Sequence, residues 1–230
     1  MKGVSSKQPP TSKGSKLPLR LERVEVRFLF LVLVFVLVAC SNDDDKGDPV
    51  PNLYTELCDL YVNSSRVVSV ATLDDGTKLD FTSQNIKANV ADTTLRSVIM
   101  YTPAGGKPRM YSFTPAVCGQ ALPPTSFPSQ PHDPVKLVSI WRSSRYINMS
   151  LGEKTTEKGT HRYGFCITGL VSKTLQVSLL HQQPSGDLPS YTNKRYVSLL
   201  LHTDHATGYD YIAVTIPTFD GNRTYTFKAE

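Results

Sequence analysis

RVVSVATLDDGTKLDFT, residues 66–82, is the stretch of sequence that decides the fold. Two runs rich in Val, Leu and Thr, 66–73 and 77–82, are separated by the three turn residues 74–76. An Asp-Gly step between runs of high strand propensity predicts a β-hairpin, because Gly76 supplies the positive φ that the turn requires.

A second hairpin is predicted immediately downstream. Its strands are 95–102 and 109–113, and the connection at 103–106 has the sequence Pro-Ala-Gly-Gly. Four or five strands within a short segment are typical of a small barrel, which removes exposed sheet edges but encloses a modest core. We therefore predict a small β-barrel domain over residues 61–118.

The C-terminal part of the chain, residues 135–230, reads as a second domain made of strands. Apolar and polar residues alternate in several runs, a pattern that indicates one buried and one solvated face. Seven short strands separated by turn residues predict an immunoglobulin-like β-sandwich, and we expect Trp141, the only tryptophan, to lie in its core. The predicted strands are 136–142, 145–151, 161–168, 174–181, 195–202, 209–216 and 223–228.

A proline-rich segment separates these two regions. Residues 118–134 read CGQALPPTSFPSQPHDP and contain five prolines. Proline neither continues a helix nor occupies a central strand, so we predict a linker over 119–134. No convincing helical periodicity occurs on either side, and the predicted fold class is all-β.

The N-terminal region resembles the signal peptide of a bacterial lipoprotein. Twelve apolar residues, 28–39, follow basic residues and precede Cys40. A membrane-spanning helix needs about 20 apolar residues, whereas a signal sequence has about 7–15. We expect residues 1–39 to be a signal peptide with a long basic region, Cys40 to be acylated, and residues 40–60 to form a linker.

This assignment predicts an outer-membrane lipoprotein in the cell envelope that contacts the membrane through its lipid. The acidic residues 43–45 are interpreted either as a solvated tether or as a signal for display on the outer face. Residues 1–39 carry seven Lys and Arg and two Glu, so their removal leaves 18 basic and 18 acidic residues. A neutral mature chain without a basic stripe predicts no binding to nucleic acid.

Several stretches resemble the NigD-like lipoproteins over nearly the whole mature chain. The resemblance implies an OB-like N-terminal barrel and a C-terminal β-sandwich, and it implies no enzymatic activity or cofactor. The stretches that carry it are ATLDDGTKL at 71–79, the hairpin at 105–106, DPV at 133–135, Trp141 with RYINM at 145–149, and LLHQQPSGD at 179–187 before YVS at 196–198.

No catalytic motif is recognisable, so no catalytic residue is assigned. The chain lacks a G-x-S-x-G elbow, an H-E-x-x-H pair and a phosphate-binding loop. The candidate metal ligands are His202, Asp204, His205 and Asp210, which are residue types that bind zinc. In an extended strand His202 and Asp204 share a face while His205 points away, and we therefore predict a polar hairpin connection without a metal.

Cysteine usage leaves two interpretations open. Cys58 and Cys118 bracket the first domain, and a disulfide between them would contribute about 4 kcal/mol in the chain-entropy model. Free thiols are the alternative, and we expect them. Cys166 alternates with apolar neighbours and is predicted to be a buried thiol. Thr93, in Asp92-Thr93-Thr94, is a candidate site of O-glycosylation.

Two classes of function follow. The first is a non-enzymatic binding or interaction module at the cell envelope, whose partner is an envelope protein or a glycan. The second is a surface hydrolase or glycan-processing enzyme whose carboxylates come from separate strands, since such pairs are defined by their separation in space. The sequence favours the binding module and leaves the oligomeric state open.

Overall fold

The computed structural model describes residues 52–103, 107–143, 145–155, 159–184, 191–201 and 208–229. These residues form thirteen β-strands and two short 3-10 helices but no α-helix, which confirms the all-β prediction. Within this described part of the chain, no helix is long and apolar enough to cross a membrane.

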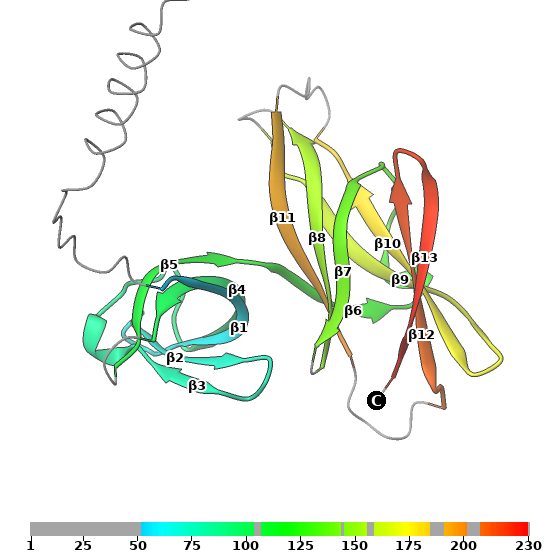
Figure 1. The fold of residues 1–230 in the computed structure, drawn as a ribbon. Coiled ribbons are helices and arrows are strands. Elements are labelled where there is room, and N and C mark those ends of the chain that lie inside the picture. Colours follow the sequence, from blue (N-terminus) through cyan, green and yellow to red (C-terminus); the bar gives the residue numbers. More distant parts are fainter. Residues whose placement is uncertain are drawn as a thin grey trace, which may run out of the picture. The chain divides into compact units, whose positions relative to one another are not determined.

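The first five strands form a nearly closed barrel (Figure 1). Their order in the sheet is β3-β2-β1-β4-β5, and every neighbouring pair is antiparallel. Gln84 extends the edge of β5, because its side-chain amide donates to the carbonyl of Pro108 at 3.0 Å and accepts from the Met110 amide at 3.1 Å. The bounds are β1 Tyr54–Val62, β2 Val68–Leu73, β3 Lys78–Asp80, the helix η1 Thr82–Gln84, β4 Thr93–Thr102 and β5 Arg109–Pro115.

The central strand of this barrel, β1, lies mostly within the segment predicted to be a linker over 40–60. That prediction was wrong for Tyr54 onward, since β1 pairs with both β2 and β4. The acidic residues Glu56 and Asp59 interrupt the apolar pattern that would otherwise indicate a strand at β1. Leu60 and Val62 are fully buried and anchor the strand in the barrel core.

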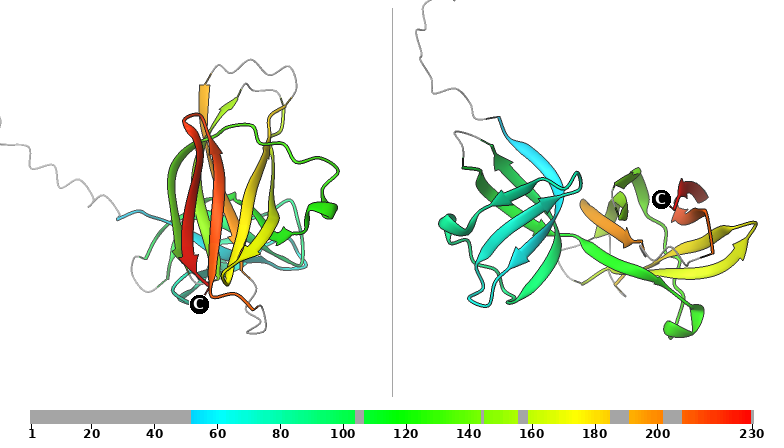
Figure 2. Two further views of the ribbon diagram at one scale, coloured as in Figure 1. Left: turned by 90° about the vertical axis from the view of Figure 1, so that its right-hand side faces the viewer. Right: turned by 90° about the horizontal axis from the view of Figure 1, so that it is seen from below.

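The remaining eight strands form the sandwich (Figure 2). The sheet order is β13-β12-β10-β9-β6-β11-β8-β7, and one continuous core contains buried residues of β8, β9, β10, β11 and β12. All seven strands predicted in this region are present. The bounds are β6 Val117–Leu122, the helix η3 Pro124–Ser126, β7 Lys136–Ser143, β8 Tyr146–Thr155, β9 Arg162–Val171, β10 Thr174–Gln182, β11 Tyr191–Leu200, β12 Tyr211–Thr218 and β13 Gly221–Lys228.

Strand β6 joins the two halves of this sheet. Its first residues run parallel to β11, with Val117 opposite Val197, and its last residues run parallel to β9, with Ala121 opposite Phe165. A strand therefore occupies the start of the segment 119–134 that was predicted to be a linker. The Gly and Gln within it weaken the strand pattern, and the prolines begin only where β6 ends.

The rest of the proline-rich segment also belongs to the sandwich. Phe127 lies against Gly164 of β9, where a Cβ atom would come within 2.9 Å of its ring. His181 in β10 donates its amide to the carbonyl of Pro131 at 3.0 Å, and the Asp133 amide donates to the carbonyl of His181 at 3.0 Å. Residues 119–134 are therefore a structural part of the second domain.

Candidate functional site

A cleft of about 480 Å³ lies between β1, the β2–β3 turn and β7. Its lining combines three carboxylates with the single indole of the chain and contains no basic residue. Both sheets that contribute to it belong to the compact unit Pro51–Glu230. The lining residues are Thr55, Glu56, Leu57, Leu73, Asp74, Asp75, Trp141 and Ser143.

The predicted hairpin at 66–82 places two of these carboxylates. Gly76 has a φ of +89°, and its amide donates to the carbonyl of Leu73 at 2.9 Å, which closes the turn. Asp75 accepts the amide of Thr77 at 2.8 Å. This backbone hydrogen bond lowers the pKa of Asp75, so the exposed Asp75 carboxylate is ionised at neutral pH.

The third carboxylate, Glu56, comes from the central barrel strand. The hydroxyl of the buried Tyr101 on β4 donates to Glu56 Oε2 at 2.7 Å. Burial, followed by this hydrogen bond, raises the pKa of Tyr101 well above its usual value. Tyr101 therefore remains a neutral donor that positions Glu56 without neutralising it.

Trp141 forms the sandwich side of the cleft. It lies on β7 opposite Asn148 and is half-buried at the edge of the sheet rather than within the sandwich core cluster. The expectation of a core tryptophan was therefore wrong. Ile140 packs against the sandwich core, so Trp141, the next residue of β7, points to the opposite face of the strand.

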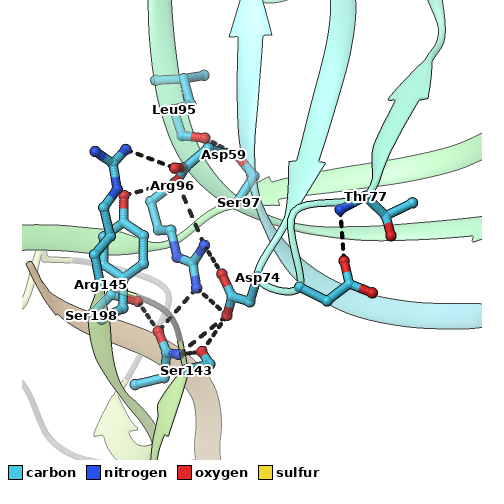
Figure 3. A network of polar contacts seen from close by, with 12 residues as sticks. Asp59, Asp74, Thr77, Leu95, Arg96, Ser97, Ser143, Arg145 and Ser198 are labelled. Carbon is cyan, nitrogen blue, oxygen red and sulfur yellow. Dashed lines mark hydrogen bonds and ion pairs between the residues drawn. The ribbon is translucent and has the colours of Figure 1, made fainter. Parts of the chain in front are cut away.

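Figure 3 shows that Asp74, the carboxylate beside Asp75 in the turn, is bound by the buried Arg96. Arg96 on β4 donates to both carboxylate oxygens of Asp74, at 2.6 and 2.8 Å, and to Oδ1 of Asn148 at 3.2 Å. Its guanidinium lies 3.9 Å from the ring centroid of Tyr146. The sequence analysis missed this residue, although a single charge inside the apolar run LRSVIMYT is a signal that a partner is present.

The sandwich supplies further partners for the same carboxylate. Ser143 donates to Asp74, Asn148 donates to the Ser143 hydroxyl at 2.6 Å, and Ser198 donates to Asn148 at 2.7 Å (Figure 3). Each of these three side chains is hydrogen-bonded, whereas the buried Nε of Arg96 has no hydrogen-bond partner among the described residues. Asp74 is thus fixed from both the barrel and the sandwich.

A second barrel carboxylate, Asp59, joins the network. It accepts from Arg145 and from the Tyr146 hydroxyl, both at 2.8 Å, and lies 3.5 Å from Arg96. Burial and the bond to Asp59 raise the pKa of Tyr146 to about 12. Burial alone would lower the pKa of Arg96, but its pairing with Asp74 outweighs that effect and the net shift is upward.

The charges of the cleft follow from this network. Asp74 is compensated by Arg96, whereas Glu56 and Asp75 form no ion pair with any other described residue. The cleft lining therefore contains Trp141 and two carboxylates that have no counter-ion among the described residues. An indole face and ionised carboxylates are the surroundings that attract an organic cation.

A second buried polar cluster lies within the sandwich. His181 is fully buried, and its Nδ1 lies 2.8 Å from the carbonyl oxygen of Asp133. A carbonyl can only accept, so Nδ1 of His181 carries the proton and Nε2 accepts from Nδ1 of His161 at 2.8 Å. Nearby, Glu153 accepts from Tyr163 at 2.7 Å and from Arg195 at 2.9 Å.

This buried cluster makes folding sensitive to acid. Burial lowers the pKa of His181 below its ordinary value of 6.5, so the unfolded chain binds the proton more readily. Stability is fully present above pH 6.5 and is lost as the pH falls through the folded-state pKa. Between pH 7.5 and 5.5 we expect His181 to account for a loss of up to about 1.4 kcal/mol.

Urea unfolding at both pH values measures this effect. We expect His181→Gln to lower the stability at pH 7.5 but to show a smaller loss on acidification than the wild type. The matched variant His132→Gln, at a less buried histidine, keeps the wild-type loss. An equal loss in wild type and His181→Gln would contradict the assignment.

The other predicted site residues are placed as follows. Cys40, His202, Asp204 and His205 lie outside the described residues. Asp210 is described, and its carboxylate pairs with Lys173 at 3.5 Å. Among the described residues no group of three or more potential ligands could hold a metal ion.

The other three cysteines and the candidate glycosylation site are described. Cys58, Cys118 and Cys166 are free thiols, so the disulfide considered between Cys58 and Cys118 is absent. Burial raises the pKa of Cys58 to about 12, which makes this thiol unreactive. Thr93 begins β4, opposite Val62, and its side chain is partly buried.

Comparison with known proteins supports the architecture. Residues 128–229 match the family described as the NigD-like C-terminal beta sandwich domain. A comparison with curated proteins gave no match.

Three crystal structures have a similar fold. A NigD-like immunity protein from Bacteroides caccae has a TM-score of 0.59 and 19% identity, over 78% of this chain and 99% of its own. A putative toxin-related protein from Parabacteroides distasonis has a TM-score of 0.58 and 15% identity, over 77% and 93%. A DUF1344 protein of unknown function from Bacteroides vulgatus has a TM-score of 0.56 and 15% identity, over 76% and 90%. The resemblance found in the sequence is thus confirmed, and residues 128–229 form a NigD-like C-terminal β-sandwich domain.

Proposed function

We propose that this protein is a non-enzymatic binding module of the cell envelope, anchored through Cys40, which binds a basic segment of a protein partner in the Trp141 cleft. The observation that carries the proposal is the composition of that cleft. Its lining contains Trp141, Glu56 and Asp75 but no basic residue, and neither Glu56 nor Asp75 has a counter-ion among the described residues.

A lysine or arginine side chain fits this arrangement. A cation over an indole gains about 0.5–2 kcal/mol, depending on how far it is desolvated, and hydrogen bonds to charged groups add about 1.5–3 kcal/mol each. Tyr101 binds one carboxylate oxygen of Glu56, and the other oxygen has no hydrogen-bond partner among the described residues, so it can accept from an incoming ammonium group. The Arg96 network keeps the walls of the cleft fixed, which lowers the entropy lost on binding.

The similar structures favour a protein as the source of this cation. Two of them are described as a NigD-like immunity protein and as a putative toxin-related protein. We carry this idea to the present chain as part of the proposal. A glycan partner is the alternative that the binding experiment below distinguishes.

No specific observation supports the alternative hypothesis that the protein is a hydrolase. A carboxylate that acts as acid or base must be free to exchange protons with a substrate. Asp59 and Asp74 are both bound to Arg96, and Glu153 is bound to Arg195 and Tyr163. We therefore assign Asp59, Asp74 and Glu153 to structure, and Glu56 and Asp75, which have no ion-pair partner among the described residues, to the proposed cation site.

If Cys40 carries the proposed lipid anchor, Cys40→Ser changes the location of the protein. Each acyl methylene adds about 0.8 kcal/mol of membrane affinity, and stable anchoring requires two chains or a second signal. We expect wild type in the outer-membrane fraction and Cys40→Ser as soluble protein or as an unprocessed precursor. Wild-type protein found soluble with residues 28–39 retained would contradict the anchor.

Calorimetric titration with a trilysine peptide tests the proposed binding of a basic segment in the Trp141 cleft. Triglutamate is the control peptide. We expect saturable binding of trilysine that the double variant E56Q/D75N weakens about tenfold or more, because it removes both uncompensated charges. D220N, the same type of change at the β12–β13 turn, which does not line the cleft, should bind as wild type does. Neutral oligosaccharides that bind in a Trp141-dependent way, without trilysine binding, would replace the protein partner by a glycan.

A further inference from the structure

A second cavity, of about 380 Å³, lies in the sandwich between β7, β8 and the β12–β13 turn. It shares no lining residue with the Trp141 cleft. Three cations and one carboxylate line it, which leaves a net formal charge of +2. The charged residues are Lys136, Lys154, Arg223 and Asp220.

Strand register brings the two lysines to one face. Lys136 of β7 lies opposite Gly152 of β8, and Lys154 is two residues further along β8. Directly opposite residues and residues two apart share a face of an antiparallel sheet. Gly152 permits this approach, since a Cβ atom there would come within 3.0 Å of Thr192 and 3.3 Å of Lys136.

The lysine charges are not compensated within the described residues. Asp220 is bound to Arg223 at 3.1 Å, and neither Lys136 nor Lys154 forms an ion pair there. Lys154 lies 4.6 Å from the ring centroid of Phe219, a side chain that is 47% exposed. The cavity thus has, beside an aromatic surface, two ammonium groups that form no ion pair with any described residue.

We propose that this cavity binds a phosphate monoester, with the phosphate between Lys136 and Lys154 and the attached group over Phe219. A phosphate monoester carries about −1.5 to −2 charges at pH 7, which matches the net charge of the lining. A carboxylate would neutralise only half of it. The hydroxyl of Thr192 lies on the same strand face, opposite Lys154, and offers an additional neutral donor.

Calorimetric titration of the full chain in neutral detergent at low salt tests the site. The probes are inorganic phosphate, glucose 6-phosphate and glucose. We expect both phosphates to bind saturably and glucose not to bind. K136Q and K154Q should each weaken phosphate binding about tenfold, because each removes one charge-assisted contact, whereas K78Q on the barrel strand β3 should leave it unchanged.

The comparison of glucose 6-phosphate with inorganic phosphate shows whether the site binds a sugar phosphate or free phosphate. Tighter binding of glucose 6-phosphate than of phosphate, with the difference removed by F219A, assigns a sugar phosphate to the site. Equal binding of both assigns free phosphate. The absence of saturable binding, or equal affinity in wild type, K136Q and K154Q, would overturn the proposal and would leave the Trp141 cleft untouched.

Discussion

A fragment that begins at Val135 is expected to remain unfolded, whereas a fragment that begins at Ala116 is expected to fold. The longer fragment retains β6, which pairs with β11 and β9 in the interior of the sandwich sheet. Without β6, the backbone groups that bind it lose their partners at the seam between the two halves of the sheet. Buried backbone groups without partners are strongly destabilising.

The residues that follow β6 add to this effect. The shorter fragment also lacks Phe127, which packs against Gly164, and Asp133, which accepts from His181 and from the amide of Gln183 at 2.7 Å. Circular dichroism and urea unfolding distinguish the outcomes. Cooperative unfolding of 135–230 with a β-type spectrum would show that β6 is dispensable.

Replacement of Arg96 by methionine is expected to cost about 3–5 kcal/mol of stability, the range for removal of one partner from a buried ion pair. The Arg96 side chain is 1% exposed, and its loss leaves Asp74, Asp59 and Asn148 without their shared donor. Arg96→Lys should not restore stability, because one ammonium group cannot make the paired contact to Asp74.

Chemical denaturation of the full chain measures this loss. The matched control is Arg223→Met, which removes the exposed pair with Asp220 and should cost less than about 1 kcal/mol. The double variant R96M/D74L should lose less than the sum of the single variants, because the uncompensated carboxylate is gone. Equal small losses in R96M and R223M would contradict the structural role of Arg96.

The parts of the fold that could be predicted were predicted from turn residues and from the alternation of apolar and polar residues. Asp75-Gly76 specified the hairpin that positions two cleft residues, and the alternation at 146–151 specified β8 within the sandwich. These signals are local, so a single sequence contains them. The strands β1 and β6 were missed because Glu56, Asp59 and Gly119 interrupt the apolar pattern, and only the neighbouring strands show why a strand forms there.

The site was less predictable because its residues come from distant segments. Arg96 and Asn148 meet across the barrel and the sandwich, and no spacing within the sequence reports that contact. Trp141 was predicted to be buried because tryptophan is usually found in cores, but its place on the edge strand β7 exposes part of the ring. The buried pair of His161 and His181 likewise depends on strand pairing between β9 and β10.

Fluorescence of Trp141 during titration with trilysine tests the central claim most directly, because this residue is the only tryptophan and lines the cleft. The account predicts a saturable change in emission that follows the calorimetric binding curve, weakens with added salt, and is lost in E56Q/D75N but kept in D220N. Emission that stays constant while trilysine binds, or that changes equally in wild type and E56Q/D75N, would contradict binding of a cation in the cleft.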